Sequence, residues 1–454
     1  MKMKNLRPWA FITLIAFATF SCQDDDPAAS PEVKSYTLSE QSGVTWLEGT
    51  VDVNLTLSGA KKYMLKGFVY VKAPAVLTIE PGTIIKGDQT SNATLIIEQG
   101  ARIMAEGTAA QPIVFTSAKA KGGRAAGNWG GIIVLGKAPT NLGANARIEG
   151  GVDRPYGGTD VNDNSGVLKY VRIEYSGIAF QPDNEINGLT LGGVGNGTTI
   201  DYVQVSFNGD DAFEFFGGTV NAKHLIAFKT VDDMFDTDNG FSGKLQFLVG
   251  LSNPNVADAS SSNGFESDGD SQGSDATPKT SATFSNVSLF GPKATSSTTA
   301  NSLFKRAMHV RRNSNIAVHN SLFAGWPEGL LLDGTKSQVN ATAGTLKMQN
   351  VVIAGTPAGK ELLAESGSSF DVAAWFNAAA NNNAVVAENA TLNIAAAFNQ
   401  NNPDFRPGAG SALLTGASFT GMDAFFTTVA YKGAFGTEDW TAGWTNWNPQ
   451  ETDY

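Results

Sequence analysis

Four carboxylates occupy equivalent positions in two repeated segments of the chain. FDTD at 235–238 carries Asp236 and Asp238, and FESD at 265–268 carries Glu266 and Asp268. Alternate residues of a β-strand point to the same face, so the four acids are expected to form a two-by-two block. Carboxylate oxygens suit Ca²⁺, which takes about six to eight oxygen ligands. The pattern therefore predicts a candidate calcium site at this block.

A block of four acids carries an electrostatic cost. Neighbouring strands lie about 4.8 Å apart, and two like charges at about 5 Å repel by roughly 3 kcal/mol at an intermediate dielectric constant. Three arrangements relieve this repulsion: carboxylates with a raised pKa, a bound cation, or basic side chains of His309 and Arg311 that fold back onto the acids. A solvated acidic surface without a ligand is the fourth reading, and the sequence leaves all four open. The acids of the preceding turns are expected to extend the same acidic ridge: Asp210, Asp211, Asp232 and Asp233.

The same residues allow a catalytic alternative. Glycoside hydrolysis uses two carboxyl groups about 5 Å or about 6.5–9.5 Å apart, and the strand spacings span both values. Asp236, Glu266, His309 and Arg311 would be the catalytic groups of such a hydrolase, or of a polysaccharide lyase. The sequence contains no lyase motif that we identify, so it favours a non-catalytic protein and keeps the enzyme as the alternative.

The elements that carry these acids repeat along the chain. VQVSFNGDDAFEFFGG (203–218) aligns with LIAFKTVDDMFDTDNG (225–240) at a spacing of 22 residues, and a third copy follows 30 residues later, after an insertion near 252–262. VLTIEPGTIIKG (76–87) also aligns with TLIIEQGARIMA (94–105) at a spacing of 18. Short alternating strands at such spacings indicate a solenoid, in which each turn of the coil packs against its neighbours.

The predicted fold is all-β: a right-handed parallel β-helix over residues 36–400, with C-terminal rungs and a cap over 401–454. Right-handedness follows from the strong preference of parallel crossover connections. The column of Phe213, Phe235, Phe265, Met308 and Leu330 is expected to point inward. Trp440, Trp444 and Trp447 near the C-terminus are interpreted either as part of the cap or as a platform for carbohydrate rings.

The N-terminus predicts export and a lipid anchor. Residues 1–21 combine a basic start with a short apolar run, which is typical of a signal peptide, and Cys22 is the only cysteine in the chain. Thr19 to Cys22 resembles a lipobox, so Cys22 is the expected lipidation site and residues 22–35 the flexible linker. The sequence Gln23, Asp24, Asp25 and Asp26 resembles the acidic export signal of Bacteroidetes-type surface lipoproteins. We therefore expect a palmitate-type lipid anchor in the outer membrane, with the protein exposed at the cell surface.

Several longer stretches carry a family resemblance. LTIEPGTIIKG, GNWGGIIVLGKAPTN, DNSGVLKYVRIEYSG and NPDFRPGAGSALLTGA are similar to the β-helical surface lipoproteins of Bacteroidetes-type bacteria. The resemblance covers most of the mature chain and implies a pectate-lyase-like fold. It implies no agreed activity, because this fold carries many functions.

Charge narrows the range of partners. The formal net charge is -11, and so acidic a chain is repelled by phosphate backbones, which argues against nucleic acid. The expected partners are the outer membrane, through the lipid anchor, and a glycan or an envelope protein. The leading prediction is a non-catalytic binding or adhesion scaffold, or an outer-membrane accessory protein, with calcium on its acidic face as one of the open readings.

Overall fold

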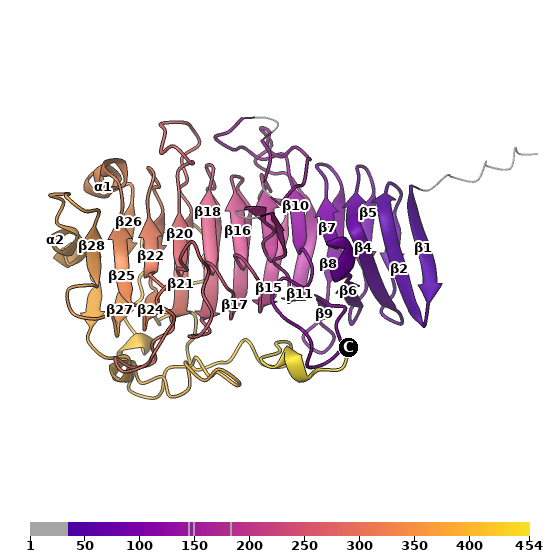
Figure 1. Ribbon diagram of the computed structural model, residues 1–454. Coiled ribbons are helices and arrows are strands. Elements are labelled where there is room, and N and C mark those ends of the chain that lie inside the picture. The colour runs from indigo at the N-terminus through magenta and orange to yellow at the C-terminus, as the bar shows by residue number, and fades with distance from the viewer. Residues whose placement is uncertain (1–34, 144–145, 149, 182–183) are drawn as a thin grey trace, which may run out of the picture. The chain divides into compact units, whose positions relative to one another are not determined.

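Stacked parallel strands form the main body of the molecule, as the repeats predict. The computed structural model describes residues 35–143, 146–148, 150–181 and 184–454. Residues 34–454 form one structural unit. In the described residues, 27 strands belong to one continuous hydrogen-bonded sheet, and this sheet coils in a right-handed sense into three faces (Figure 1).

Face 1 carries the acids singled out in the sequence. Its strands pair in parallel in the order β7 (Thr94–Ile97), β10 (Ile132–Leu135), β14 (Leu189–Gly192), β16 (Phe213–Phe216), β18 (Phe235–Asp238), β20 (Phe265–Ser267), β22 (Arg306–Val310), β25 (Glu328–Leu332) and β28 (Leu362–Ala364).

Faces 2 and 3 share several long strands. Face 2 contains β3 (Leu55–Leu57), β5 (Val76–Ile79), β8 (Arg102–Glu106), β23 (Ala317–His319) and β26 (Lys347–Gln349). Two strands begin in face 3 and run on into face 1, where the second of them pairs with β7: β2 (Val44–Val51) and β4 (Lys62–Val71). Face 3 also contains β6 (Ile84–Gly87), β9 (Ile113–Ser117), β24 (Leu322–Ala324), β27 (Val352–Ala354) and β29 (Ala384–Val386). The strands that run through both faces are β11 (Gly166–Glu174), β15 (Thr199–Ser206), β17 (Asn221–Phe228), β19 (Lys244–Leu251) and β21 (Thr283–Phe290).

A single residue bends each shared strand from face 2 into face 3. These bend residues all have a positive φ, between 50° and 62°: Tyr170, Tyr202, His224, Phe247, Asn286 and, at the equivalent corners further on, Asn320 and Asn350. The left-handed backbone conformation is the one that turns the chain sharply without adding residues. We call this stacked set of residues the bend column.

The inward positions form the core that the repeats predict. Phe213 pairs with Phe235, Phe235 with Phe265, and Phe265 with Met308, and the side chains of these residues are buried. The predicted column is therefore confirmed. The predicted insertion is also present, because the chain between β19 and β20 forms a long loop from 252 to 264.

The alignment at 18 residues is wrong as a stacking relation. β5 lies in face 2 and pairs with β8, so that Ile79 lies beside Ala105, whereas β7 lies in face 1 and pairs with β4 and β10. Strands of all three faces share the pattern of alternating apolar residues followed by a glycine turn, so two different faces resemble each other in sequence.

The remaining elements are an antiparallel edge strand of the main sheet, a separate two-stranded sheet and short helices. β1 (Tyr36–Gln41) pairs antiparallel with β2, and β12 (Ala179–Gln181) pairs antiparallel with β13 (Asn184–Glu185). The helices are α1 (Thr335–Thr342), α2 (Val372–Phe376) and the short 3₁₀ segments η1 (Gln89–Ser91), η2 (Ala379–Asn381), η3 (Asn389–Leu392), η4 (Ala412–Leu414) and η5 (Pro449–Glu451).

The C-terminal region differs from the prediction. β29 ends at Val386 and no strand follows it in the described residues up to 454, so the expected rungs after residue 400 are absent. This segment has single aromatic residues among Gly, Pro, Asn and Asp instead of alternating apolar runs, and so it does not extend the sheet. The end of the stack is covered by α2, whose Val372 and Phe376 join the main core, while the tail runs back along the side of the stack toward the N-terminal strands (Figure 1).

Candidate functional site

The predicted acids lie together on the outer side of face 1. Asp236 pairs with Glu266 across β18 and β20, and Glu266 pairs with His309 on β22. On the other side, Asp236 pairs with Glu214 on β16. These positions alternate with buried core residues, so the outward column predicted from the repeats is present in the structure.

Two arginines fold back onto one half of the block. Arg311 contacts Glu266 and places its Nε 2.7 Å from Oδ1 of Asp268, and the guanidinium of Arg312 lies 2.7 Å from Oδ2 of Asp268. Among the described residues, Asp236 and Asp238 form no ion pair. Basic side chains were one of the arrangements that the sequence left open. They offset the negative charge of Glu266 and Asp268, but not that of the other two acids of the block.

The four residues of the catalytic alternative also meet. Nδ1 of His309 lies 3.2 Å from Oε2 of Glu266, and its Nε2 lies 2.9 Å from Oδ2 of Asp333. Arg311 contacts the same Glu266, which is the strand neighbour of Asp236. His309 thus bridges two carboxylates, and a proton transfer by its ring would require one of these contacts to break.

The acids continue into the turns that lead to face 1. Asp210 and Asp211 precede β16, and Asp232 and Asp233 precede β18. With residues of the strands they line a cavity of about 290 Å³, which we call the acidic pocket. Its lining consists of Glu185, Asp210, Asp211, Glu214, Asp232, Asp233, Asp236, Asp258, Ser260, Ser261, Glu266 and Arg311.

Hydrogen bonds between the turns hold these acids in place. The backbone N–H of Asp233 donates to Oδ1 of Asp211 at 2.8 Å, and the backbone N–H of Asn263 donates to Oδ1 of Asp233. The insertion loop closes the pocket, because the hydroxyl of Ser260 donates to Oδ2 of Asp232 at 3.0 Å. The repeats did not place Asp258 and Ser260 in the pocket, since an insertion has no register with its neighbours.

Two groups of pocket oxygens are each spaced as ligands of one cation would be. Carboxylate oxygens of Asp210, Asp211 and Asp232 lie within 4.8 Å of one another, and so do those of Asp211, Glu214 and Asp236. Oxygens around one Ca²⁺ lie about 2.3–2.6 Å from the ion and hence up to about 5 Å from each other. Oδ1 of Asp232 and Oδ1 of Asp236 are buried and accept no hydrogen bond from any described residue, so the donor set fits a hard divalent cation.

Burial makes the acids of the pocket hard to ionise. Burial, reinforced by the neighbouring Asp233, raises the pKa of Asp211 well above its ordinary value, and burial next to Glu266 does the same for the pKa of Asp236. Burial, together with Asp210, raises the pKa of Asp232 to about 8. At neutral pH these side chains therefore need protons or a cation to offset their mutual repulsion.

The pKa values of the acids on the strands of face 1 shift in different directions. Burial, with the charge of Asp268, raises the pKa of Asp238 to about 7. Burial alone would raise the pKa of Glu266 as well, but the hydrogen bond from His309 and the charge of Arg311 lower it overall. Asp236 and Glu266 are thus neighbouring carboxyl groups whose pKa values move in opposite directions.

The three tryptophans lie along the side of the stack and do not cover its end. Trp440 lines a cavity together with Tyr202 and His224, so the platform for carbohydrate rings stays a prediction. The ring of Trp444 is 1% exposed and meets those of Tyr170 and Tyr202 edge-on at 5.9 and 5.8 Å. Trp447 packs edge-on against Phe228 at 5.0 Å, and Trp440 stacks on Phe435 at 5.0 Å. The apolar outer surface of face 3 explains this arrangement, because these rings cover it.

The anchor residues lie outside the described part of the chain. Cys22 and the segment Gln23, Asp24, Asp25 and Asp26 fall in residues 1–34, so lipidation and surface export stay predictions. Within the described residues, no helix combines the length and the apolar character needed to cross a membrane.

Fold and site together define a class: a right-handed parallel β-helix with an acid-lined pocket on its outer surface. A model of the pectate-lyase like beta helix domain matches residues 49–445. The chain belongs to this family, as the predicted fold implied.

Other comparisons add little to this assignment. The chain is similar to a solved structure titled "Crystal structure of Dettilon tailspike protein (gp208)", with 9% sequence identity and a TM-score of 0.25. That similarity covers 69% of this chain and 62% of the tailspike chain, so this chain spans less than two thirds of the tailspike's length. The comparison with curated proteins gives no match.

Proposed function

We propose that this protein is a non-catalytic binding scaffold whose acidic pocket holds a divalent cation of the Ca²⁺ type. The ligands would come from two groups of carboxylates that share Asp211: Asp211, Glu214 and Asp236, and Asp210, Asp211 and Asp232. Calcium would neutralise the turns of neighbouring rungs and fix the outer surface of face 1 for a glycan or an envelope protein. Relative to the sequence-based prediction, the proposed ion lies nearer the N-terminal side of the block and keeps Asp236 as the shared ligand.

The observation that carries this proposal is the pair of buried oxygens without hydrogen bonds, Oδ1 of Asp232 and Oδ1 of Asp236. A buried carboxylate oxygen without a partner costs several kcal/mol unless a proton or a cation compensates it. The nearby arginine charges already face Glu266 and Asp268, which leaves this compensation to a proton or to the proposed ion.

Thermal unfolding with and without calcium tests the cation. We expect added Ca²⁺ to raise the melting temperature by several degrees over the protein in EDTA, because a ligand that binds only the folded state stabilises it. Asp236→Asn should raise the melting temperature in EDTA, since it removes a repelling charge, and should also reduce the increment caused by calcium.

Asp453→Asn is the matched control, because Asp453 is exposed and lies outside the pocket. It should leave the calcium increment unchanged. Equal melting temperatures in calcium and in EDTA for the unaltered protein would contradict the cation proposal.

A carbohydrate-active enzyme is the second candidate, and one observation favours it. Asp236 and Glu266 are adjacent, and their pKa values shift in opposite directions, as is found for the acid and the base of hydrolytic sites. Incubation with neutral and acidic polysaccharides separates the two functions. Release of reducing ends or of unsaturated sugars, lost in Asp236→Asn, would replace the binding role by catalysis.

We further propose that the scaffold is displayed on the outer membrane through lipid on Cys22, with Gln23, Asp24, Asp25 and Asp26 as the surface export signal. The apolar run before the lone cysteine supports this proposal. Labelled palmitate should enter the protein and not its Cys22→Ser variant, and protease should cleave the protein on intact cells. Protection from protease would place the protein on the inner leaflet.

A further inference from the structure

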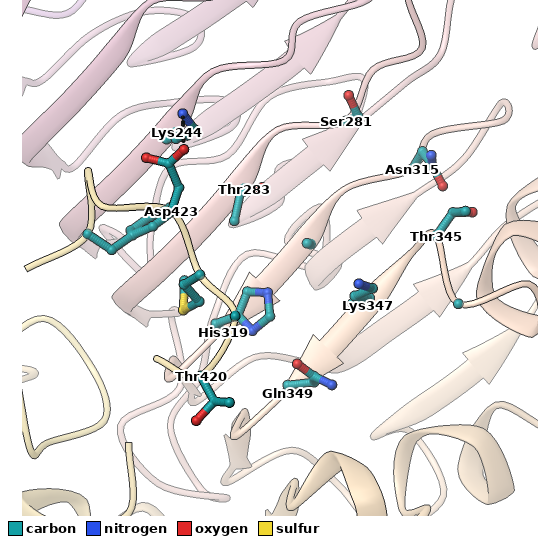
Figure 2. A pocket seen from close by; sticks show the side chains of 15 residues that line it. Lys244, Ser281, Thr283, Asn315, His319, Thr345, Lys347, Gln349, Thr420 and Asp423 are labelled. Atoms are coloured by element: carbon teal, nitrogen blue, oxygen red, sulfur yellow. Dashed lines mark ion pairs between the residues drawn. The ribbon is translucent and has the colours of Figure 1, made fainter. Parts of the chain in front are cut away.

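A second cavity lies on the outer surface of face 2, over its C-terminal strands. It has a volume of about 460 Å³, within the range of small-molecule sites. Strands β19, β21, β23 and β26 form its floor, and tail residues 420–423 and 426 form one wall. Figure 2 shows the labelled side chains of the floor and of the wall around this cavity, which we call the face 2 pocket.

The strand register sets the polar side chains in rows across the floor. One row runs from Lys244 through Thr283 and Ala317 to Lys347. With about 4.8 Å between strands, the two lysines stand about 14 Å apart. The small side chains in the middle of the row leave the depression between them.

The wall is fixed at one end of this row. Nζ of Lys244 lies 2.8 Å from Oδ2 of Asp423, an ion pair that Figure 2 marks. Further contacts hold the tail nearby, since the backbone of Thr427 exchanges two hydrogen bonds with the side chain of Gln246 at 2.8 Å each. The pocket is therefore built from two segments that are tied together.

Two polar groups in the pocket have no partner in the described residues. The side chain of His319 is 9% exposed and points into the pocket beside Lys347 and Gln349, and no described residue forms a hydrogen bond with its ring. Oδ1 of Asn315 is buried and likewise accepts no hydrogen bond from the described residues. Such groups are costly unless something else in the site pairs with them.

The charges of the pocket favour an anion. Lys347 forms no ion pair within the described part of the chain, whereas Lys244 is neutralised by Asp423. Burial, together with the charge of Lys347, lowers the pKa of His319 to about 4, so at neutral pH its ring offers one N–H donor and one acceptor nitrogen. One uncompensated positive charge thus lies beside neutral polar groups, on a chain with a net charge of -11.

We propose that the face 2 pocket binds an acidic sugar, with its carboxylate at Lys347 and a hydroxyl group at the ring of His319. A simple anion has no donor for the acceptor nitrogen of the His319 ring, and a neutral sugar leaves Lys347 unpaired. A sugar acid provides both an anion and O–H donors. The hydroxyls of Ser281, Thr283 and Thr345 around the floor suit a hydroxylated ligand better than the apolar side chains of a peptide.

This inference goes beyond the proposed cation-dependent scaffold, because none of the pocket's lining residues belongs to the acidic pocket. The two proposals fail separately. Calcium stabilisation without sugar binding would overturn only the face 2 site, and sugar binding in EDTA would support it whether or not calcium binds.

Titration of the full mature chain in EDTA tests the site, using ligand-observed NMR. Methyl β-glucuronide and methyl β-glucoside differ only at the carboxylate, and acetate carries the charge without the hydroxyls. We expect the glucuronide to bind at least about tenfold more tightly than either control probe. Equal binding of the glucoside, equal binding of acetate, tighter binding of an acidic dipeptide, or no binding of any probe would each overturn the proposal.

Variants locate the binding in the face 2 pocket. Lys347→Gln removes the free charge at an exposed position, and Asn315→Asp places an isosteric negative charge opposite the ligand; each should weaken glucuronide binding at least about tenfold. Lys62→Gln alters an exposed lysine on β4, far from the pocket, and should bind as the unaltered protein does. If Lys347→Gln and Lys62→Gln bind the glucuronide equally, the site is wrong.

Discussion

Individual side chains of this β-helix show how stacking concentrates charge and how a fold tolerates it. Identical strand positions recur on neighbouring rungs, so acids such as Asp236 and Glu266 become direct neighbours. Arg311 and Arg312 offset the charge of Glu266 and Asp268. Asp211, Asp232 and Asp236 have no such partners within ion-pair distance in the described residues, and burial raises the pKa of all three. The ionisation of these three carboxyl groups must therefore change the free energy of unfolding.

The raised pKa values predict a fall in stability with rising pH when no divalent cation is present. A carboxyl group whose folded-state pKa exceeds its unfolded value stabilises the folded protein below the unfolded pKa, and this contribution is lost as the pH rises through the folded pKa. Burial raises the pKa of Asp232 to about 8 and the pKa of Asp238 to about 7. In EDTA, we expect the free energy of unfolding to fall by about 3 kcal/mol between pH 6.5 and 8.5.

Urea denaturation at several pH values measures this change. The window begins at pH 6.5 because His319, whose folded pKa is lowered to about 4, has the opposite dependence at lower pH. Asp238→Asn should flatten the profile, and calcium should do the same. A free energy of unfolding that rises across this window in EDTA would contradict the assignment.

The bend column is the element that joins the coil to its tail. Asn286 adopts a φ of 55°, a conformation that Asn tolerates better than most residues do. Its Nδ2 donates to the carbonyls of Tyr431 and Gly433 at 2.9 and 3.2 Å. Asn320 is equivalent: its side chain accepts from the backbone N–H of Ser418 at 2.9 Å and donates to the carbonyl of the same residue at 3.0 Å. The side-chain amides of Asn286 and Asn320 thus form hydrogen bonds with the backbone of the tail, as a neighbouring strand would.

Asn286→Ala should therefore destabilise the protein by about 2–4 kcal/mol in urea denaturation. The change adds strain at a positive φ and leaves buried polar groups unpaired. Asn286→Gly is the informative control, because it keeps the backbone conformation accessible and removes only the amide. If the glycine variant is as stable as the unaltered protein, the amide does not fasten the tail.

The whole molecule is a stack of rungs with the C-terminal tail lying along one side. We call this tail the strap. The strap ends at Tyr454, whose hydroxyl donates to Oε1 of the buried Glu174 at 2.6 Å, while its carbonyl accepts from Nζ of Lys86 at 2.9 Å. Trp444 and Trp447 lie a few residues before this end of the strap, and they cover the apolar outer side of face 3. Rungs of a solenoid contact mainly their neighbours, whereas this strap links rungs that are distant in sequence.

Deletion of residues 440–454 is expected to lower the melting temperature and to expose apolar surface without dissolving the coil. The rungs retain their own neighbours, so the far-UV circular dichroism should stay that of a β protein while binding of a hydrophobic dye increases. Deletion of Tyr454 alone should have a smaller effect of the same sign. Loss of all β-structure in the longer deletion would mean that the strap belongs to the cooperative core, and an unchanged melting temperature would mean that its packing adds no stability.

The sequence by itself determined the fold class, the inward column from Phe213 to Leu330 and the neighbourhood of Asp236 and Glu266. It did so because a repeat with constant spacing fixes which residues stack. The same reasoning misassigned the 18-residue repeat, since strands of different faces have the same alternation of apolar and polar residues.

Only the tertiary structure decided which acids keep a basic partner, where the tryptophans lie and what the tail encloses. The side chains of Arg311 and Arg312 reach back across a rung, and the sequence pattern does not specify rotamers. The tail has no periodicity, so its path along the side of the coil depends on contacts with residues more than a hundred positions away, such as Asn286 with Tyr431. The strand register sets the polar rows on the floor of the face 2 pocket. The pocket itself forms only because the tail follows this path and closes one side of the floor.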